Sequence, residues 1–343
     1  MSRVVTFGEI MARLATPGYA RFQQAMPGSM NVTFAGAEAS IAVSLARLGV
    51  DAAFVTALPQ HEIADACISD LRRLGVETKH ILRTADGRLG LYFLEHGINQ
   101  RGGQVIYDRD GSAVSITPAS AYDWEAIFSG CEWFVISGIT PALSRTAADV
   151  ALQAVQEAAR RKIRVVCDMN YRTKLWRWEP PLTARQLATR TMSALLPYVH
   201  VFVGGASDAT AMLDLESSDD PQQLAALLTQ QYPNLSHVAM TVRAGSNAMV
   251  QCFGGFLYES ATQRTYTTPA FAMTHVVDRL GAGDAFTAGL VGSFLHQADL
   301  QTTLDFATAA GCLAHSIEGD YNHSTREEIE ALMQGEASGR VRR

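Results

Sequence analysis

Short apolar runs rich in valine, isoleucine and phenylalanine recur along the chain, and each ends in glycine or a polar residue. This pattern predicts buried strands at 3–10, 51–58, 132–139, 163–170, 199–205 and 237–242. Between them, small and apolar residues at helical spacing predict helices over 36–49, 64–75 and 144–162. Strands alternating with helices indicate an α/β fold, with a mostly parallel central sheet and helices on both faces. In such sheets, ligands bind at the carboxyl ends of the strands.

One stretch interrupts the alternation. Residues 88–97 and 104–117 are two extended runs joined by INQRGG, with no helix between them. Together with residues 12–34 they predict a small antiparallel β lid, a device that excludes water from a transfer reaction. The alternative is a structural hairpin at a sheet edge. We expect a single domain over 1–333 that includes these lid segments, followed by a short basic tail at 334–343.

Composition narrows the function classes. Hydrophobic residues make up 48% of the chain and charged residues 18%, which suits a folded protein with a large core. A net charge of −6 argues against nucleic acid as a partner. The five cysteines form no C-x-x-C pair, so we expect reduced thiols in a cytoplasmic protein and no zinc site. Neither a signal peptide nor an apolar run of membrane-spanning length is recognisable, so no membrane association is predicted.

The most informative motif is Gly281-Ala282-Gly283-Asp284, which stands directly before a long apolar run. Glycine allows tight turns and close approach to the backbone, and the first turn of a helix offers unpaired N–H groups to an anion. A phosphate bound there, with Asp284 beside it, is one interpretation. The other is that Asp284 merely caps a helix beginning near Ala285.

The wider sequence resembles one family at five places in register. DRLGAGDAFTAGL (278–290) is similar to the C-terminal signature of the ribokinase-like (PfkB) carbohydrate kinases. The other four are VVTFGEIMARL, AGAEASIAVSLARLG, DMNYRTKLW and IEGDYNHSTREEIEALM. Together they resemble the 2-keto-3-deoxygluconate kinase branch over nearly the whole chain. The resemblance implies a ribokinase-like fold, a cytoplasmic enzyme that uses ATP and Mg²⁺, and a homo-oligomer formed through the β lid.

The resemblance assigns catalysis to the glycine-rich motif. Backbone N–H groups of Gly281, Ala282 and Gly283 would form an anion hole for the transferred phosphoryl group. Asp284 would accept the proton of the attacking sugar hydroxyl. A carboxylate suffices as the base because a loose phosphoryl-transfer transition state needs little early deprotonation.

Arginines point to an acidic substrate. Tyr107 and Arg109 lie two apart on a predicted strand and so share a face, and Arg172 follows the carboxyl end of another strand. Guanidinium groups pair with carboxylates in a two-pronged geometry, whereas a neutral sugar would leave them unpaired. The positions that the resemblance assigns to the keto-deoxy acid are Gly36, Ala37, Glu38, Tyr92, Tyr107, Arg109 and Arg172.

The nucleotide side departs further from the family pattern. The resemblance implies cofactor-binding roles for Asn170, Asp208, Thr241, Arg243, Gly245, Ser246 and Thr308. Ala248 replaces a usual glycine, and Thr308 stands where relatives often have asparagine. In place of the usual N-x-x-E element the chain has Gly205 and Asp208; Asp208 would order Mg²⁺ through water, with Asp168 as a second candidate.

The resemblance also suggests a monovalent cation at Asp278 and at the carbonyl of Leu280. The main functional prediction is phosphorylation of the terminal hydroxyl of 2-keto-3-deoxygluconate. The alternatives are a kinase for another sugar acid or a ketose such as fructose, and a sugar-acid-binding regulatory protein that has lost catalysis. A Rossmann dehydrogenase is excluded because no G-x-G-x-x-G follows the first strand.

Overall fold

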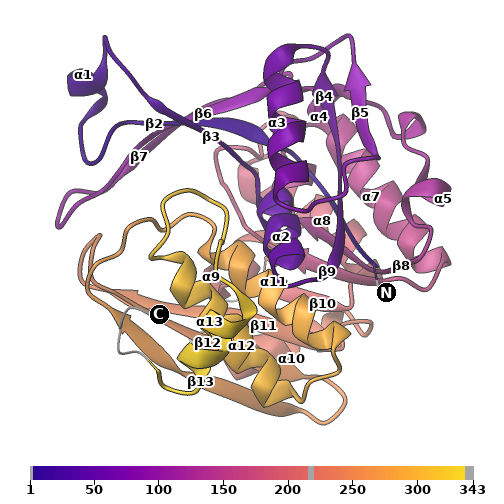
Figure 1. Cartoon of the computed structure of the whole chain (residues 1–343). Helices are drawn as coiled ribbons and strands as arrows, with labels where there is room; N and C mark the ends of the chain where they lie inside the picture. Colours follow the sequence, from indigo (N-terminus) through magenta and orange to yellow (C-terminus); the bar gives the residue numbers. More distant parts are fainter. Residues whose placement is uncertain (1–2, 215–219, 337–343) are drawn as a thin grey trace.

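A nine-stranded sheet runs through the computed structural model, which describes residues 3–214 and 220–336 (Figure 1). Its order is β13-β12-β11-β10-β9-β8-β1-β4-β5. Seven strands pair in parallel, and β12 and β13 add an antiparallel edge. The parallel strands are β1 Arg3–Phe7, β4 Asp51–Pro59, β5 Ile81–Thr84, β8 Cys131–Ser137, β9 Arg164–Asp168, β10 Val201–Gly204 and β11 His237–Gly245; β12 is Gln251–Glu259 and β13 Arg264–Met273.

Helices cover both faces of this sheet. On one face lie α2 Ala37–Arg47, α3 Glu62–Arg73, α11 Ala282–Leu295, α12 Leu300–Ala314 and α13 Arg326–Met333. On the other lie α7 Arg145–Arg160, α8 Ala184–Leu195, α9 Ala206–Leu213 and α10 Pro221–Gln231. Short helices fill the connections: α1 Phe22–Ala25, α4 Ala113–Ile116, α5 Trp124–Ile127, α6 Ile139–Ala142, and the 3₁₀ turns Ala119–Ala121 and Leu196–Tyr198.

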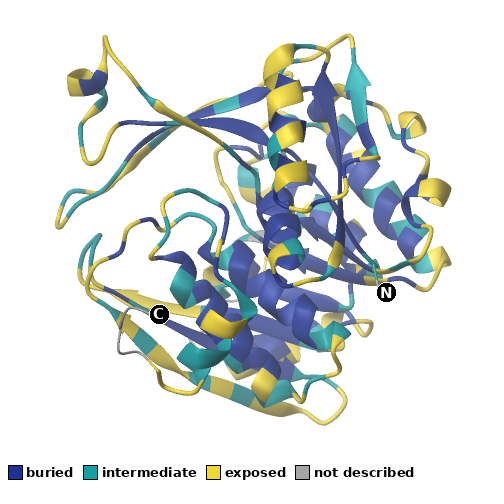
Figure 2. Ribbon diagram, viewed as in Figure 1, coloured by how far each residue is buried: buried dark blue, intermediate teal, exposed yellow. Residues whose placement is uncertain are grey.

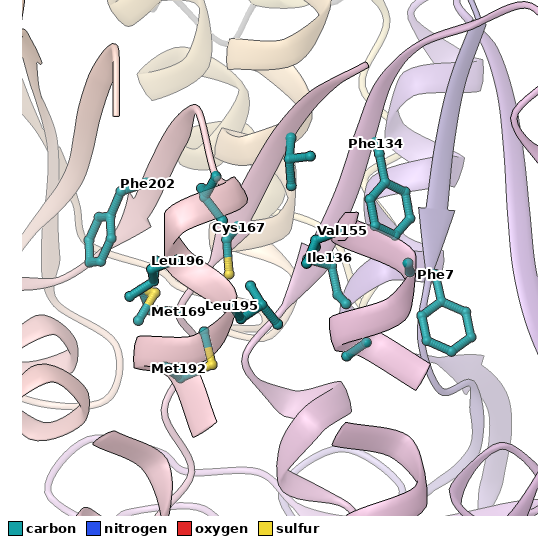
Figure 3. Close-up of a cluster of buried hydrophobic side chains, with 14 of the residues drawn as sticks. Phe7, Phe134, Ile136, Val155, Cys167, Met169, Met192, Leu195, Leu196 and Phe202 are labelled. Carbon is teal, nitrogen blue, oxygen red and sulfur yellow. The ribbon is translucent and has the colours of Figure 1, made fainter. Parts of the chain in front are cut away.

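The period-two pattern of the strands divides the core into two layers. On β1, Phe7 packs against the α7 and α8 side, whereas Val4 faces α2 and α11. Figure 3 shows the first layer, where Phe134 and Ile136 of β8 lie near Val155 of α7. Buried residues follow the sheet and the inner faces of its helices (Figure 2). The parallel strands are therefore buried on both faces, as their continuous apolar runs predict.

A second sheet forms the lid, in the order β3-β2-β6-β7. Its strands are β2 Met11–Ala15, β3 Asn31–Ala35, β6 Gly90–Glu95 and β7 Gln104–Asp108. The outer pairings β2–β3 and β6–β7 are antiparallel, and the central pairing β2–β6 is parallel. Figure 1 shows these strands reaching away from the helices of the body, with α1 at their far end.

The predicted elements are confirmed with shifted ends. All six predicted strands belong to the parallel part of the main sheet, and the three predicted helices are α2, α3 and α7. The run 104–117 is only partly extended, because the strand ends at Asp108 and Ala113–Ile116 is helical. Most of the predicted basic tail, 337–343, lies outside the described residues. Within 3–214 and 220–336, no helix is long and apolar enough to cross a membrane.

Candidate active site

A cavity of about 970 Å³ lies between the lid and the carboxyl ends of the central strands. Its walls come from β6 and β7 of the lid, from the ends of β9, β10 and β11, and from the turn that leads into α11. Segments far apart in the sequence therefore meet at one place, which is where an open α/β sheet binds its ligand.

The glycine-rich motif forms the first turn of α11. The helix begins at Ala282, with Gly281 as its N-cap at φ 77°. A side chain at Gly281 would also lie 2.0 Å from the carbonyl oxygen of Asp320, so only glycine fits there. At Gly283 the nearest atom to an added Cβ would be Arg243 Nη2 at 3.8 Å, which leaves this backbone accessible from the cavity.

Asp284 lies inside this first turn, with its side chain lining the cavity and not in the capping position. The capping interpretation is therefore wrong. Burial raises the pKa of its carboxyl well above the usual range, and the charges of Asp168 and Asp320 raise it further. A buried carboxyl that adjoins other acids holds a proton more tightly than a free one.

Asp168 and Asp208 offer a place for a divalent cation. Asp168 ends β9, and burial, together with the charge of Asp208, raises its pKa to about 7. Thr287 donates a hydrogen bond to Asp168 at 3.4 Å, and the backbone N–H of Gly205 donates to Asp208 Oδ2 at 2.8 Å. Two neighbouring carboxylates in the cavity match the way Mg²⁺ is held, by one or two carboxylates plus phosphates and water. The residues present thus fit the metal.

Three arginines line the cavity without an ion pair in the described part of the chain: Arg172, Arg243 and Arg279. The side chain of Arg243 lies over the ring of Phe253, with its Cζ 5.1 Å from the centroid. Burial and the nearby charges of Arg279 and Arg172 lower the pKa of Arg243. Guanidinium groups without a direct ion pair among the described residues, beside a helix N-terminus, make this part of the cavity suited to anionic ligands.

Arg109 also lines the cavity, but its charge is already matched. It forms an ion pair with Glu9, and both side chains are buried. Its Cζ lies 5.3 Å from the ring centroid of Tyr107, although Arg109 follows the end of β7 and does not share a strand with Tyr107 as predicted. The two arginines expected to bind a carboxylate therefore differ, because only Arg172 is without a carboxylate partner among the described residues.

The residues at the start of α2 divide between the cavity wall and the protein core. Gly36 and Ala37 line the cavity, and an added Cβ at Gly36 would lie 2.1 Å from the carbonyl oxygen of Glu9. Glu38 is fully buried and does not line it; its Oε1 accepts hydrogen bonds from the backbone of Ser137 and from the hydroxyls of Ser137 and Thr140. The structure thus gives Glu38 the role of joining α2 to β8.

The predicted nucleotide residues divide in the same way. Asn170, Asp208, Thr241, Arg243 and Ser246 line the cavity, whereas Gly245 and Thr308 do not. Thr308 is buried in α12 and donates a hydrogen bond to the carbonyl of Leu304 at 2.8 Å. Its hydroxyl is therefore used within the helix.

Comparison with known proteins identifies the family. The model of the pfkB family of carbohydrate kinases matches residues 1–327. The chain belongs to this family. A 2-dehydro-3-deoxygalactonokinase of Haloferax volcanii is 31% identical over 98% of both chains. The crystal structure of a 2-dehydro-3-deoxygluconokinase from Thermotoga maritima has a TM-score of 0.91 at 37% identity, covering 98% of this chain and 100% of that one. A putative ribokinase II of E. coli, in complex with ATP and Mg²⁺, shares the fold at 21% identity and TM-score 0.81, covering 98% and 100%.

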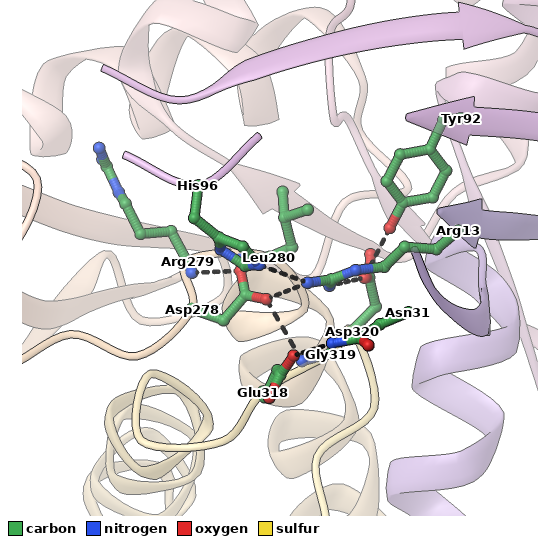
Figure 4. Close-up of polar contacts among 10 residues, drawn as sticks. All are labelled: Arg13, Asn31, Tyr92, His96, Asp278, Arg279, Leu280, Glu318, Gly319 and Asp320. Atoms are coloured by element: carbon green, nitrogen blue, oxygen red, sulfur yellow. Dashed lines mark hydrogen bonds and ion pairs between the residues drawn. The ribbon is translucent and has the colours of Figure 1, made fainter. Parts of the chain in front are cut away.

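One buried network of this kinase was not predicted from the sequence (Figure 4). Arg13 of β2 donates hydrogen bonds to Asp278 Oδ2 at 2.5 Å and to Asp320 Oδ1 at 2.6 Å, and the hydroxyl of Tyr92 donates to Asp320 Oδ1 at 2.7 Å. Arg13 is 2% exposed. The available signal was a charged residue in the middle of an apolar strand, MARLA, on the same strand face as Met11 and Ala15.

Proposed function

We propose that this kinase transfers the γ-phosphoryl group of ATP to the terminal hydroxyl of 2-keto-3-deoxygluconate, giving 2-keto-3-deoxy-6-phosphogluconate. The observation that carries the proposal is the joint presence of Asp284 and the unpaired Arg172 in one cavity. Asp284 can accept a proton from a substrate hydroxyl, as a kinase requires. The guanidinium of Arg172, which has no carboxylate partner among the described residues, suits an acidic substrate. The names of the Thermotoga and Haloferax relatives point to the same class of keto-deoxy sugar acid.

In this proposal the turn at Gly281 supplies the transfer site. The N–H groups of Ala282 and Gly283, at the start of α11, stabilise the charge on the phosphoryl oxygens. Asp284 accepts the proton of the attacking hydroxyl, and its raised pKa makes it a stronger base than an exposed aspartate. Arg243, next to Gly283, adds positive charge on the nucleotide side.

Mg²⁺ would be held through water by Asp208, with Asp168 beside it, and it would neutralise the phosphates of ATP. Thr241, Ser246 and Asn170 line the same end of the cavity and form the remaining nucleotide contacts of the proposal. Thr308 and Glu38 hydrogen-bond to neighbouring residues and, like Gly245, are given no ligand contact in this proposal.

The substrate end is formed by the lid. The rings of Tyr92 and Tyr107 lie 6.0 Å apart in register on β6 and β7, and Gly36 leaves room at the start of α2. Arg172 binds the substrate carboxylate from the opposite side of the cavity. Arg109 positions the Tyr107 ring while it remains paired with Glu9.

A coupled ADP-release assay tests the proposal against 2-keto-3-deoxygluconate, its C4 epimer 2-keto-3-deoxygalactonate, gluconate and fructose, with ATP and Mg²⁺. Arg172→Met should reduce kcat/KM for the preferred acid by roughly ten- to a hundred-fold, the value of one charge-assisted hydrogen-bonding group. The matched control is Arg177→Met, since Arg177 lies nearby in sequence but is paired with Asp110 outside the cavity. Turnover of fructose alone, or of no compound, would contradict the proposed function.

We also propose that two copies associate through the lid. One lid face lines the cavity, and the opposite face is apolar: Leu14, Phe34, Leu91 and Phe93 are half-buried, and Val32 and Ile106 are 60% and 54% exposed. A second copy of the lid would cover this face.

A cytoplasmic location belongs to the same proposal. All five cysteines are free, which suits a reducing compartment.

A further inference from the structure

The network around Arg13 connects the lid to both sides of the catalytic turn. Asp278 lies three residues before Gly281, and the carbonyl of Asp320 packs on Gly281 from the other side. One guanidinium contacts both carboxylates, and its pKa is raised chiefly by Asp320, Tyr92 and Asp278 against the cost of burial. A planar fork that holds two acids fixes their separation as well as their charge.

The carboxylate of Asp278 has no free acceptor position. Its Oδ1 accepts from the backbone N–H groups of Arg279 and Leu280 at 2.7 and 3.1 Å, and its Oδ2 accepts from Arg13 at 2.5 Å and from the N–H of Gly319 at 3.2 Å. A carboxylate offers about four such positions. A monovalent cation at Asp278 would therefore have to displace one of these donors.

The lid contacts the same two segments at further points. Tyr92 of β6 donates to Asp320, and Asn31 of β3 donates to Glu318 at 3.5 Å. His96 lies 3.4 Å from Arg13. Figure 4 shows these side chains converging on the 278–280 and 318–320 segments. The geometry of the turn thus depends on the inner face of the lid.

We propose that Arg13 is a positioning residue for phosphoryl transfer: its guanidinium is the built-in cation that holds the 278–280 and 318–320 segments around Gly281, so that the anion hole forms without an added monovalent cation. The inference rests on the proposed function. Arg13 touches neither substrate nor nucleotide in this account; it acts through Asp278, which orients the backbone of Leu280, and through Asp320, whose backbone packs on Gly281.

The experiment measures kcat and both KM values for wild type, Arg13→Ala and Arg13→Lys in tetramethylammonium buffer, with and without potassium or dilute guanidinium. Wild type should not respond to potassium. Arg13→Ala should lose roughly 100-fold in kcat, the loss typical of a disrupted oxyanion hole, with KM for ATP nearly unchanged. Guanidinium, or potassium that enters the vacated position, should increase the kcat of Arg13→Ala at least about tenfold. The same cation should raise the Tm of Arg13→Ala and not that of wild type.

The matched control is Arg88→Ala, which removes an exposed lid arginine paired with Asp108 at 2.8 Å and should leave kcat unchanged. If Arg13→Ala does not fold, Arg13→Lys is decisive, because lysine keeps the charge but not the fork and should lose about tenfold in kcat. Variants with a lower Tm but unaltered kcat would overturn the inference, as would potassium activation of wild type. Wild type inactive on every acid would instead refute the proposed function, and the inference with it.

Discussion

At the residue scale, several carboxyl side chains lie close together at the site, with few positively charged side chains between them. Burial is the largest cause of the raised pKa of Asp284, Asp168 and Glu38. The charge of Glu38 also raises the pKa of Asp168 and Asp284, and the charge of Asp168 raises that of Asp284. Positive charge comes from arginines that face the cavity and not from ion pairs with these acids. The ligand-free site therefore favours protonated carboxyls, and a bound cation favours the ionised form.

Asp284→Asn tests the base. The amide keeps the shape of the side chain and cannot accept the proton, so kcat should fall by about 10²–10⁴ while the sugar acid still binds. Steady-state turnover and calorimetric titration with the acid measure the two effects separately. Near-full turnover in the variant would show that another group accepts the proton.

The pKa of Asp168 predicts how stability changes with pH. It is about 7 in the folded protein and about 3.9 in an unfolded chain, so the folded state binds more protons between these values. The free energy of unfolding should therefore decrease as pH rises from about 4 to 7, by up to roughly 1.4 kcal/mol per pH unit. Urea unfolding in the presence of a chelator measures this slope. Asp168→Asn should flatten it; an equal slope in that variant would assign the effect to other acids.

At the element scale, the lid is joined to the body by buried charge and not by apolar packing alone. The Arg109–Glu9 pair joins the residue after β7 to the segment between β1 and β2. Arg13 joins β2 to the loop before α11 and to the loop between α12 and α13. Such pairs add little when complete, but they are costly to break, because one charge is left buried.

Arg109→Met should therefore lower the free energy of unfolding by about 3–5 kcal/mol, and Glu9→Gln in the same chain should recover much of the loss. Arg88→Met, which removes an exposed lid pair, should cost less than about 1 kcal/mol. Equal losses in Arg88→Met and Arg109→Met would refute the special role of burial.

The elements of the parallel sheet could be predicted because each strand carries its own apolar run. The motif at Gly281 was equally local, since its glycines and Asp284 are consecutive. The parallel β2–β6 pairing and the Arg13 network could not be predicted, because they depend on residues far apart in sequence meeting in space. Thr308 and Glu38 were assigned ligand roles because a sequence does not show whether a polar side chain faces a cavity or bonds its own helix.

At the scale of the whole molecule, the lid has two different faces. The inner face carries Arg13, Tyr92 and Tyr107. On the outer face Leu14, Phe34 and Leu91 pack in part against the cluster under α2 and α3, whereas Val32 and Ile106 are exposed. A sheet with one polar working face and one apolar face is stable when a second copy packs on it.

Val32→Asp combined with Ile106→Asp should convert an oligomer into monomers, because each charge would be buried at the lid contact. Sedimentation velocity measures the change. Leu227→Asp on α10 is the control, since this leucine is 38% exposed on the body and should leave the assembly intact. A monomeric wild type would contradict association through the lid.

The contact between Arg13 and Asp320 has a consequence for folding during synthesis of the kinase. This contact spans 307 positions of the chain, so the catalytic turn cannot take its final shape until a ribosome has delivered nearly all of the domain. Contacts this distant in sequence carry a large cost of loop closure and are slow to form. A nascent chain with a finished central sheet would still lack the carbonyl that packs on Gly281. A chain that ends before Asp320 would therefore have Arg13 in place but not the partner that fixes the turn at Gly281.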